Sequence, residues 1–76
     1  MSLELVRYIV YNLASDPDKL DVSVEHRGRD THIEIRCAPE DSGRIIGRGG
    51  RVISSIRTLA RAAAEGQGRV EVQLID

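Results

Sequence analysis

The feature that most constrains the fold of this chain is residues 44–53, with the sequence RIIGRGGRVI. Three glycines and an arginine occupy four consecutive positions, between two pairs of β-branched residues. A turn this rich in glycine lets another backbone approach closely, because no Cβ stands in the way. A helix that begins directly after it presents unpaired N–H groups and the positive end of its dipole. The segment therefore predicts a clamp for a phosphate group between two helices.

The distribution of charge supports an anionic ligand. The 76 residues carry a net charge of −1, which argues against a protein that coats nucleic acid through its overall charge. Residues 42–64, however, contain five arginines and no acidic residue, whereas the remainder holds six basic and twelve acidic residues. A solvated charged face would explain a basic helix alone. The position of the arginines around the glycines favours an anionic ligand instead.

Apolar periodicity predicts the elements of the first half of the chain. Apolar residues spaced at i, i+3, i+4 and i+7 predict a helix over residues 3–13, which Asp16-Pro17 ends. Apolar and polar residues alternate over residues 20–25 and again over 33–37. This alternation predicts two half-buried strands, and the glycine-containing segment 27–30 between them predicts a hairpin.

Two helices and one strand are predicted for the second half. Pro39 is expected at the first position of a short helix, which ends where Gly47 adopts a left-handed conformation. A longer helix is expected from about Gly50 to Glu65, and a last strand follows around Val72. The buried side of the longer helix is expected to comprise Val52, Ile53, Ile56, Leu59, Ala60 and Ala63.

The element order α-β-β-α-α-β predicts an α+β fold. A chain that leaves one strand through two helices and returns to the next strand makes a crossover connection, so these two strands should be parallel and the connection right-handed. We expect a three-stranded mixed sheet covered on one face by three helices.

The glycine-rich segment does not match two known nucleotide-binding motifs, either in its residues or in the secondary structure around it. A P-loop needs lysine and then serine or threonine after its last glycine, but Gly50 is followed by Arg51-Val52. A dinucleotide fingerprint beginning at Gly47 would require glycine or alanine at position 52 and a strand before the loop. Here Val52 occupies that position, and the preceding element is predicted to be a helix.

Residues 45–53 resemble the central motif of the KH domain, whose Gly-x-x-Gly loop clamps about four backbone nucleotides of RNA. The flanking Ile-Ile and Val-Ile pairs and the basic residue inside the tetrad strengthen the resemblance. The order of elements matches the type II arrangement of bacterial members. The whole chain, residues 1–76, is similar to the small stand-alone KH proteins of the KhpA (YlqC) type. The resemblance implies a non-catalytic protein that binds single-stranded RNA.

The resemblance also implies which residues bind RNA. Glycines 47 and 50 shape the turn, Arg48 projects toward phosphate, and backbone N–H groups around 49–51 complete the contact. Ile46 and Ile35 would form the floor on which bases lie, although core packing explains both equally well. Without Phe or Trp, base stacking on aromatic side chains is not expected, so sequence preference should be loose. The candidate RNA-binding residues are Arg44, Ile46, Gly47, Arg48, Gly49, Gly50 and Arg51.

The helix expected from about Gly50 to Glu65 suggests how the chain could bind a partner. Ser55, Thr58 and Ala62 recur at i, i+3 and i+7 on the side away from the expected core. We hypothesise that this row of small side chains allows self-association; an ordinary exposed face is an equal alternative. The resemblance implies a homodimer and pairing with a larger RNA-binding partner of the KhpB (Jag) type. It further implies an RNA chaperone or post-transcriptional regulator linked to cell elongation and division.

A protein-interaction module with a vestigial loop is the main alternative to RNA binding. An enzyme is the weakest option, because His26, His32 and Cys37 lack a partner base or ligand cluster at a recognisable spacing. No catalytic residue, metal or cofactor is expected. The lone cysteine, the lack of a secretion signal and the lack of a long apolar run predict a cytoplasmic protein without a membrane segment.

Overall fold

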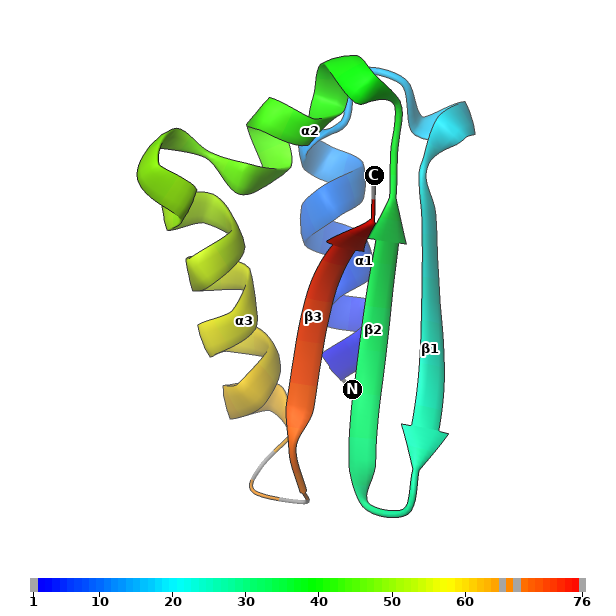
Figure 1. Cartoon of the computed structure of the whole chain (residues 1–76), viewed down its shortest axis with the longest axis vertical. Helices are drawn as coiled ribbons and strands as arrows, with labels where there is room; N and C mark the ends of the chain where they lie inside the picture. Colours follow the sequence, from blue (N-terminus) through cyan, green and yellow to red (C-terminus); the bar gives the residue numbers. More distant parts are fainter. Residues whose placement is uncertain (1, 65, 67, 76) are drawn as a thin grey trace.

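The computed structural model describes residues 2–64, 66 and 68–75. Its elements follow the predicted order, with short 3-10 turns after the first helix and between the last two (Figure 1). The predicted helix end at Glu65 lies outside the described residues. The elements are α1 (Ser2–Leu13), η1 (Pro17–Lys19), β1 (Asp21–Arg27), β2 (Asp30–Arg36), α2 (Pro39–Ile46), η2 (Arg48–Gly50), α3 (Arg51–Ala63) and β3 (Val70–Ile75).

The three strands form one mixed sheet in the order β1-β2-β3. Strands β1 and β2 are antiparallel, with Val22 opposite Ile35, and β2 and β3 are parallel, with Ile33 opposite Val72. The parallel pair confirms the predicted crossover through α2 and α3. Because residues in register share a face, the buried apolar residues of all three strands lie on one side of the sheet, while Ile75, which is opposite Arg36, lies on the other side. The predicted α+β fold is confirmed.

All three helices contribute to the core, α1 and α3 each with an apolar stripe and α2 with Ile45. In Figure 1, α1 lies behind the strands and α3 lies beside β3. The apolar stripe of each helix is buried against the apolar face of the sheet, as the helical spacing predicted. The buried apolar cluster consists of Val6, Val10, Leu20, Val22, Ile33, Ile35, Ile45, Ile53, Ile56, Ala60, Val70 and Val72.

Three local expectations are wrong. Leu59 was expected in the core but is 47% exposed, because it lies at the border of the apolar stripe of α3, where no other element of the described part of the chain covers it. Gly47 has the expected positive φ of 77°, but its ψ of 168° is extended rather than left-handed helical. The second strand was expected to extend to residue 37, but β2 ends at Arg36, and Cys37 follows it as a half-buried residue with its Sγ 3.7 Å from the Oγ of Ser42.

A buried carboxylate fixes the start of α2 to the segment after α1. Asp41 has an exposed fraction of 0%. Its Oδ1 accepts hydrogen bonds from the backbone N–H and the Oγ of Ser15, at 2.9 and 2.7 Å, and its Oδ2 accepts one from the N–H of Asp16 at 3.0 Å. The bonds from Ser15 are the main cause that lowers the pKa of Asp41, with smaller contributions from Asp16 and the charge of Arg44, while burial opposes them.

Because of Asp41, we expect the folded domain to lose stability in acid. Because the folded-state pKa of Asp41 lies below its ordinary value of 3.8, its stabilisation is complete above about that pH and is lost as the pH falls through the folded-state pKa. The Asp41→Asn variant should have a lower urea midpoint at pH 7 and a smaller further drop between pH 5 and 2.5 than the wild type. Asp18→Asn, which changes an exposed carboxylate, is the control. An unchanged midpoint for Asp41→Asn at pH 7 would contradict this role.

Candidate nucleic-acid interface

The candidate interface begins at the carboxyl end of α2. Pro39 occupies the first turn, where its missing N–H needs no acceptor, and Glu40 and Asp41 place negative charge at the positive end of the helix dipole. The helix ends at Ile46, and the N–H of the next residue, Gly47, donates to the carbonyl of Gly43 at 2.8 Å. The chain changes direction at Gly47, which has a positive φ. The end of α2 thus sets the position of the glycine turn (Figure 1).

The turn itself is tight and open to solvent. Gly49 and Gly50 have φ values of 64° and 75°, in the left-handed region that favours glycine. The N–H of Gly50 donates to the carbonyl of Gly47 at 3.1 Å, and the N–H of Arg51 donates to the carbonyl of Arg48. A Cβ built on Gly49 or Gly50 would meet no atom within 4 Å. A ligand backbone can therefore reach this surface. The N–H groups of Gly50 and Arg51, which the family resemblance assigned to phosphate, already have acceptors within the turn.

Three arginines surround the turn. Arg44 lies in the last turn of α2, Arg48 is in the turn, and Arg51 is the first residue of α3. All three are exposed, and among the described residues none of them is ion-paired. Their charges add to the positive end of the α3 dipole at the same place. The structure therefore brings the basic residues named by the sequence together around one turn.

The two isoleucines expected below the turn have different environments. Ile46, the last residue of α2, is 40% exposed beside the glycines. Ile35 is fully buried in the core and has no surface to offer a ligand. Of these two residues, only Ile46 can therefore contribute to the floor on which bases would lie.

The outward side of α3 carries the small residues and one large apolar residue. Ser55, Thr58 and Ala62 are exposed, as expected from their spacing. The hydroxyls of Ser55 and Thr58 donate back to the carbonyls of Arg51 and Ser54, at 2.9 and 3.1 Å. Since these hydroxyls are satisfied within the helix, the side chains present mainly carbon to solvent. Leu59, the exposed residue that the helical pattern had assigned to the core, extends this face.

Arg57 and Arg61 line a surface whose role was not predicted from the sequence. They lie on the side of α3 that faces the outer edge of β3, and both bond to it. Between helix and strand lies an open groove of about 720 Å³, lined by Arg57, Arg61, Arg69, Glu71, Val72 and Gln73. The i, i+4 spacing placed the two arginines on one stripe. The strand that this stripe faces is known only from the tertiary structure, which places β3 beside α3.

The structure also bears on metal sites and on membrane segments. In the part of the chain that the structure describes, no group of three or more His, Cys, Asp or Glu side chains is arranged to hold a metal ion. Within residues 2–64, 66 and 68–75, no helix has the length and apolar character needed to cross a bilayer.

Comparison with known proteins gives consistent matches along the chain. The family model described as KhpA/KhpB, KH domain, matches residues 3–75. A protein named RNA-binding protein KhpA from Caldanaerobacter subterraneus subsp. tengcongensis is 42% identical over 73 residues, covering 95% of this chain and 97% of the relative. Proteins of the same name from Leifsonia xyli subsp. xyli and Borreliella burgdorferi are 39% and 37% identical, with 91% and 97% of this chain and 90% and 92% of each relative covered. The chain therefore belongs to the KhpA/KhpB family of KH domains.

Proposed function

We propose that this chain is a non-catalytic protein that binds single-stranded RNA, with residues 1–76 acting as one KH domain and residues 47–50 as its clamp. The observation that carries the proposal is the open turn between α2 and α3, where a Cβ on Gly49 or Gly50 would meet nothing. A sugar-phosphate strand can approach such a backbone closely. The relatives named as RNA-binding proteins support the same ligand.

Electrostatics around the turn account for the choice of a phosphate ligand. Arg44, Arg48 and Arg51 each offer a charged donor, and the first N–H groups of α3 add the positive end of a helix dipole. If each arginine neutralises one phosphate, the logarithm of the affinity should fall with the logarithm of salt concentration by about 0.7 per contact. Fluorescence anisotropy with a labelled single-stranded RNA, over a range of salt concentrations, measures this slope.

A single small clamp without stacking aromatics should bind modestly, so a second copy would matter. We infer that Ser55, Thr58, Leu59 and Ala62 form a dimer face on α3. The small residues let two helices approach closely, and Leu59 supplies apolar area to bury. Two clamps joined in this way raise affinity through effective concentration without any new RNA contact. The same face can accept a larger family partner of the KhpB (Jag) type.

The Leu59→Glu variant tests the dimer face. It should sediment as the 8.4 kDa monomer at tens of micromolar while the wild type sediments as a dimer, because burying an unpaired carboxylate is costly. Tyr8→Glu is the matched control, since it places the same charge at a 70% exposed apolar position on α1. A wild type that is monomeric at this concentration, or a Leu59→Glu variant that still dimerises, would argue against this face.

The cellular role that fits a weak, dimeric RNA clamp is that of an RNA chaperone or post-transcriptional regulator in the cytoplasm. A protein-interaction module with vestigial RNA binding remains the second candidate, and the exposed Leu59 favours it. The two differ in what the glycine turn does. Only the first predicts that RNA affinity depends on the charge and conformation of residues 48 and 49.

A further inference from the structure

Two side chains of α1 donate to the backbone at the start of β1. Nη2 of Arg7 donates to the carbonyl of Val22 at 3.1 Å, and Oη of Tyr11 makes a longer contact, 3.4 Å, with the carbonyl of Leu20. The two side chains are one helical turn apart, about 6 Å along the axis. The two carbonyls are two residues apart, about 6.6 Å along an extended chain. Because the two spacings match, each carbonyl receives one side chain.

These carbonyls lie on the outer edge of β1. The strand order is β1-β2-β3, so within the described residues β2 is the only strand that pairs with β1 (Figure 1). Carbonyls that point to the same side of a strand recur at every second residue. The carbonyls of Val24 and His26 therefore point to the same edge as that of Val22, and no side chain of the described residues donates to them. The edge is blocked over its first half and open over its second.

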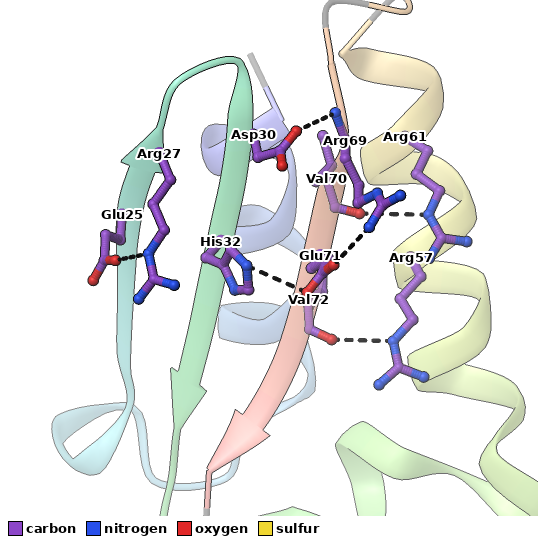
Figure 2. A network of polar contacts seen from close by, with 10 residues as sticks. All are labelled: Glu25, Arg27, Asp30, His32, Arg57, Arg61, Arg69, Val70, Glu71 and Val72. Atoms are coloured by element: carbon purple, nitrogen blue, oxygen red, sulfur yellow. Dashed lines mark hydrogen bonds and ion pairs between the residues drawn. The ribbon is translucent and has the colours of Figure 1, made fainter.

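The opposite edge of the sheet carries the same kind of contact. Arg57 and Arg61 of α3, also one helical turn apart, bond to two alternate carbonyls of β3 (Figure 2). An uncovered edge offers its backbone to another chain, and charged side chains at the edge are a common means of preventing this. Figure 1 shows β1 and the turn between α2 and α3 on opposite sides of the molecule. The contacts at β1 therefore need an explanation other than RNA binding.

The sequence of β1 favours pairing with a second copy of itself. In a two-fold antiparallel pair centred on Val24, the middle of the strand, all seven residues of β1 are paired. Asp21 is then opposite Arg27 of the second copy at both ends, and Ser23 is opposite Glu25. Opposite charges directly across a strand pair are favourable. Asp21 has no ion pair among the described residues, and the exposed contact of Arg27 with Glu25 leaves its terminal amino groups available (Figure 2).

The neighbouring two-fold registers place like charges opposite one another. Two edges bond only where outward-pointing residues face each other, so a two-fold pair is centred on a residue rather than between two. Centring the pair on Ser23 places Asp21 opposite Glu25, and centring it on Glu25 places that residue opposite itself. Like charges directly opposite are destabilising. The strand therefore specifies one register, the one centred on Val24.

We propose that the outer edge of β1 is a pairing site for a second copy of this chain, which Arg7 and Tyr11 keep closed. In the pair centred on Val24, the carbonyl of Val22 accepts from the N–H of His26 of the second copy. The guanidinium group of Arg7 already donates to this carbonyl. Strand pairing therefore requires the side chains of α1 to leave the edge. This site is separate from the RNA-binding turn and from the dimer face on α3.

Sedimentation velocity of the 76-residue chain tests the block. Leu59→Glu serves as the background, so that association through the α3 face does not contribute. In this background the unblocked variant, Arg7→Ala/Tyr11→Ala, should double the sedimenting mass at hundreds of micromolar, because alanine keeps the helix but cannot donate to the edge. The matched control, Arg29→Ala/Tyr8→Ala, removes the same residue types at exposed positions that make no bond to this edge, and should leave the mass unchanged.

Charge reversal identifies the strand that pairs. Adding Asp21→Arg to the unblocked variant places two arginines opposite each other at both ends of the pair, and should return the mass to that of the background. Adding Arg27→Asp as well exchanges the two charges and should restore the doubled mass.

Circular dichroism checks the fold of each variant before sedimentation. The proposal is overturned if the unblocked variant keeps the mass of the background, if the control doubles its mass as well, or if the doubling survives Asp21→Arg. It is also overturned if the Leu59→Glu background already forms pairs that Asp21→Arg abolishes, because Arg7 and Tyr11 would then not close the edge. A doubled mass confined to the unblocked variant and to its charge-exchanged form supports it.

Discussion

The double variant Arg48→Asp/Gly49→Asp is expected to lose RNA binding while keeping the wild-type fold. Both positions are exposed, and a Cβ at residue 49 meets no atom within 4 Å. The φ of 64° at Gly49 lies in the left-handed region, which aspartate tolerates better than most residues. The change removes one charged donor and adds two carboxylates where phosphates would lie. Affinity measured by anisotropy should fall by more than about tenfold, the loss from a single charged hydrogen bond.

The matched control is Arg48→Asn/Gly49→Asn. Asparagine has the shape of aspartate and the same tolerance of the left-handed region, so the two double variants share any conformational cost. They differ only in the two negative charges. The asparagine variant should therefore retain more of the affinity, with a salt slope reduced by about one phosphate contact. If the folded aspartate variant binds RNA as tightly as the wild type, the clamp assignment is wrong and the protein-interaction module becomes the better hypothesis.

Gly47→Ala is expected to destabilise the domain severely. A Cβ at this position would lie 2.7 Å from the Cβ and 2.8 Å from the backbone N of Val52, so the first turn of α3 would have to shift. The φ of 77° with extended ψ adds backbone strain that an L side chain rarely accepts. Overpacking and strain together suggest a loss of about 3 kcal/mol in the free energy of unfolding. In a domain of this size the melting temperature should fall by roughly 12–24 °C.

Gly43→Ala provides the comparison for this effect. Gly43 lies in the interior of α2, is exposed, and would place its Cβ in open space. Replacing glycine by alanine in an exposed helix interior should stabilise the domain by about 0.5–1 kcal/mol. The two variants thus make the same chemical change four residues apart with opposite expected signs. A Gly47→Ala variant with the melting temperature of the wild type would show that the packing of Val52 against the turn is unimportant.

The arrangement of elements was largely predictable from local pattern. The stripe in α1 and the alternation in β1 and β2 each reflect burial of one side of a single element, which the spacing of apolar residues specifies. Leu59 shows where this reasoning fails. Its spacing places it at the border of the stripe of α3, and whether a border residue is covered depends on which neighbour lies beside it. No element among the described residues covers it.

Some features of the candidate site could likewise be predicted from the sequence, and others could not. The glycine turn and its three arginines lie within eight consecutive residues, so their proximity follows from the order of the chain. The bridge from Ser15 to Asp41 spans 26 positions, and the contact of Arg57 with Val72 spans 15. Neither pairing leaves a local signal, because each depends on how distant elements pack.

The amino-acid sequence alone determined the kinds of elements, their order and the turn between α2 and α3, because helix periodicity, strand alternation and glycine conformation are short-range properties. Only the tertiary structure decided which surfaces those elements present. It buried Ile35, exposed Leu59, and brought the outer edge of β3 within reach of the arginines of α3. The physical reason is that burial and contacts between elements are set by the packing of the whole chain, and the spacing of residues within one element does not specify that packing.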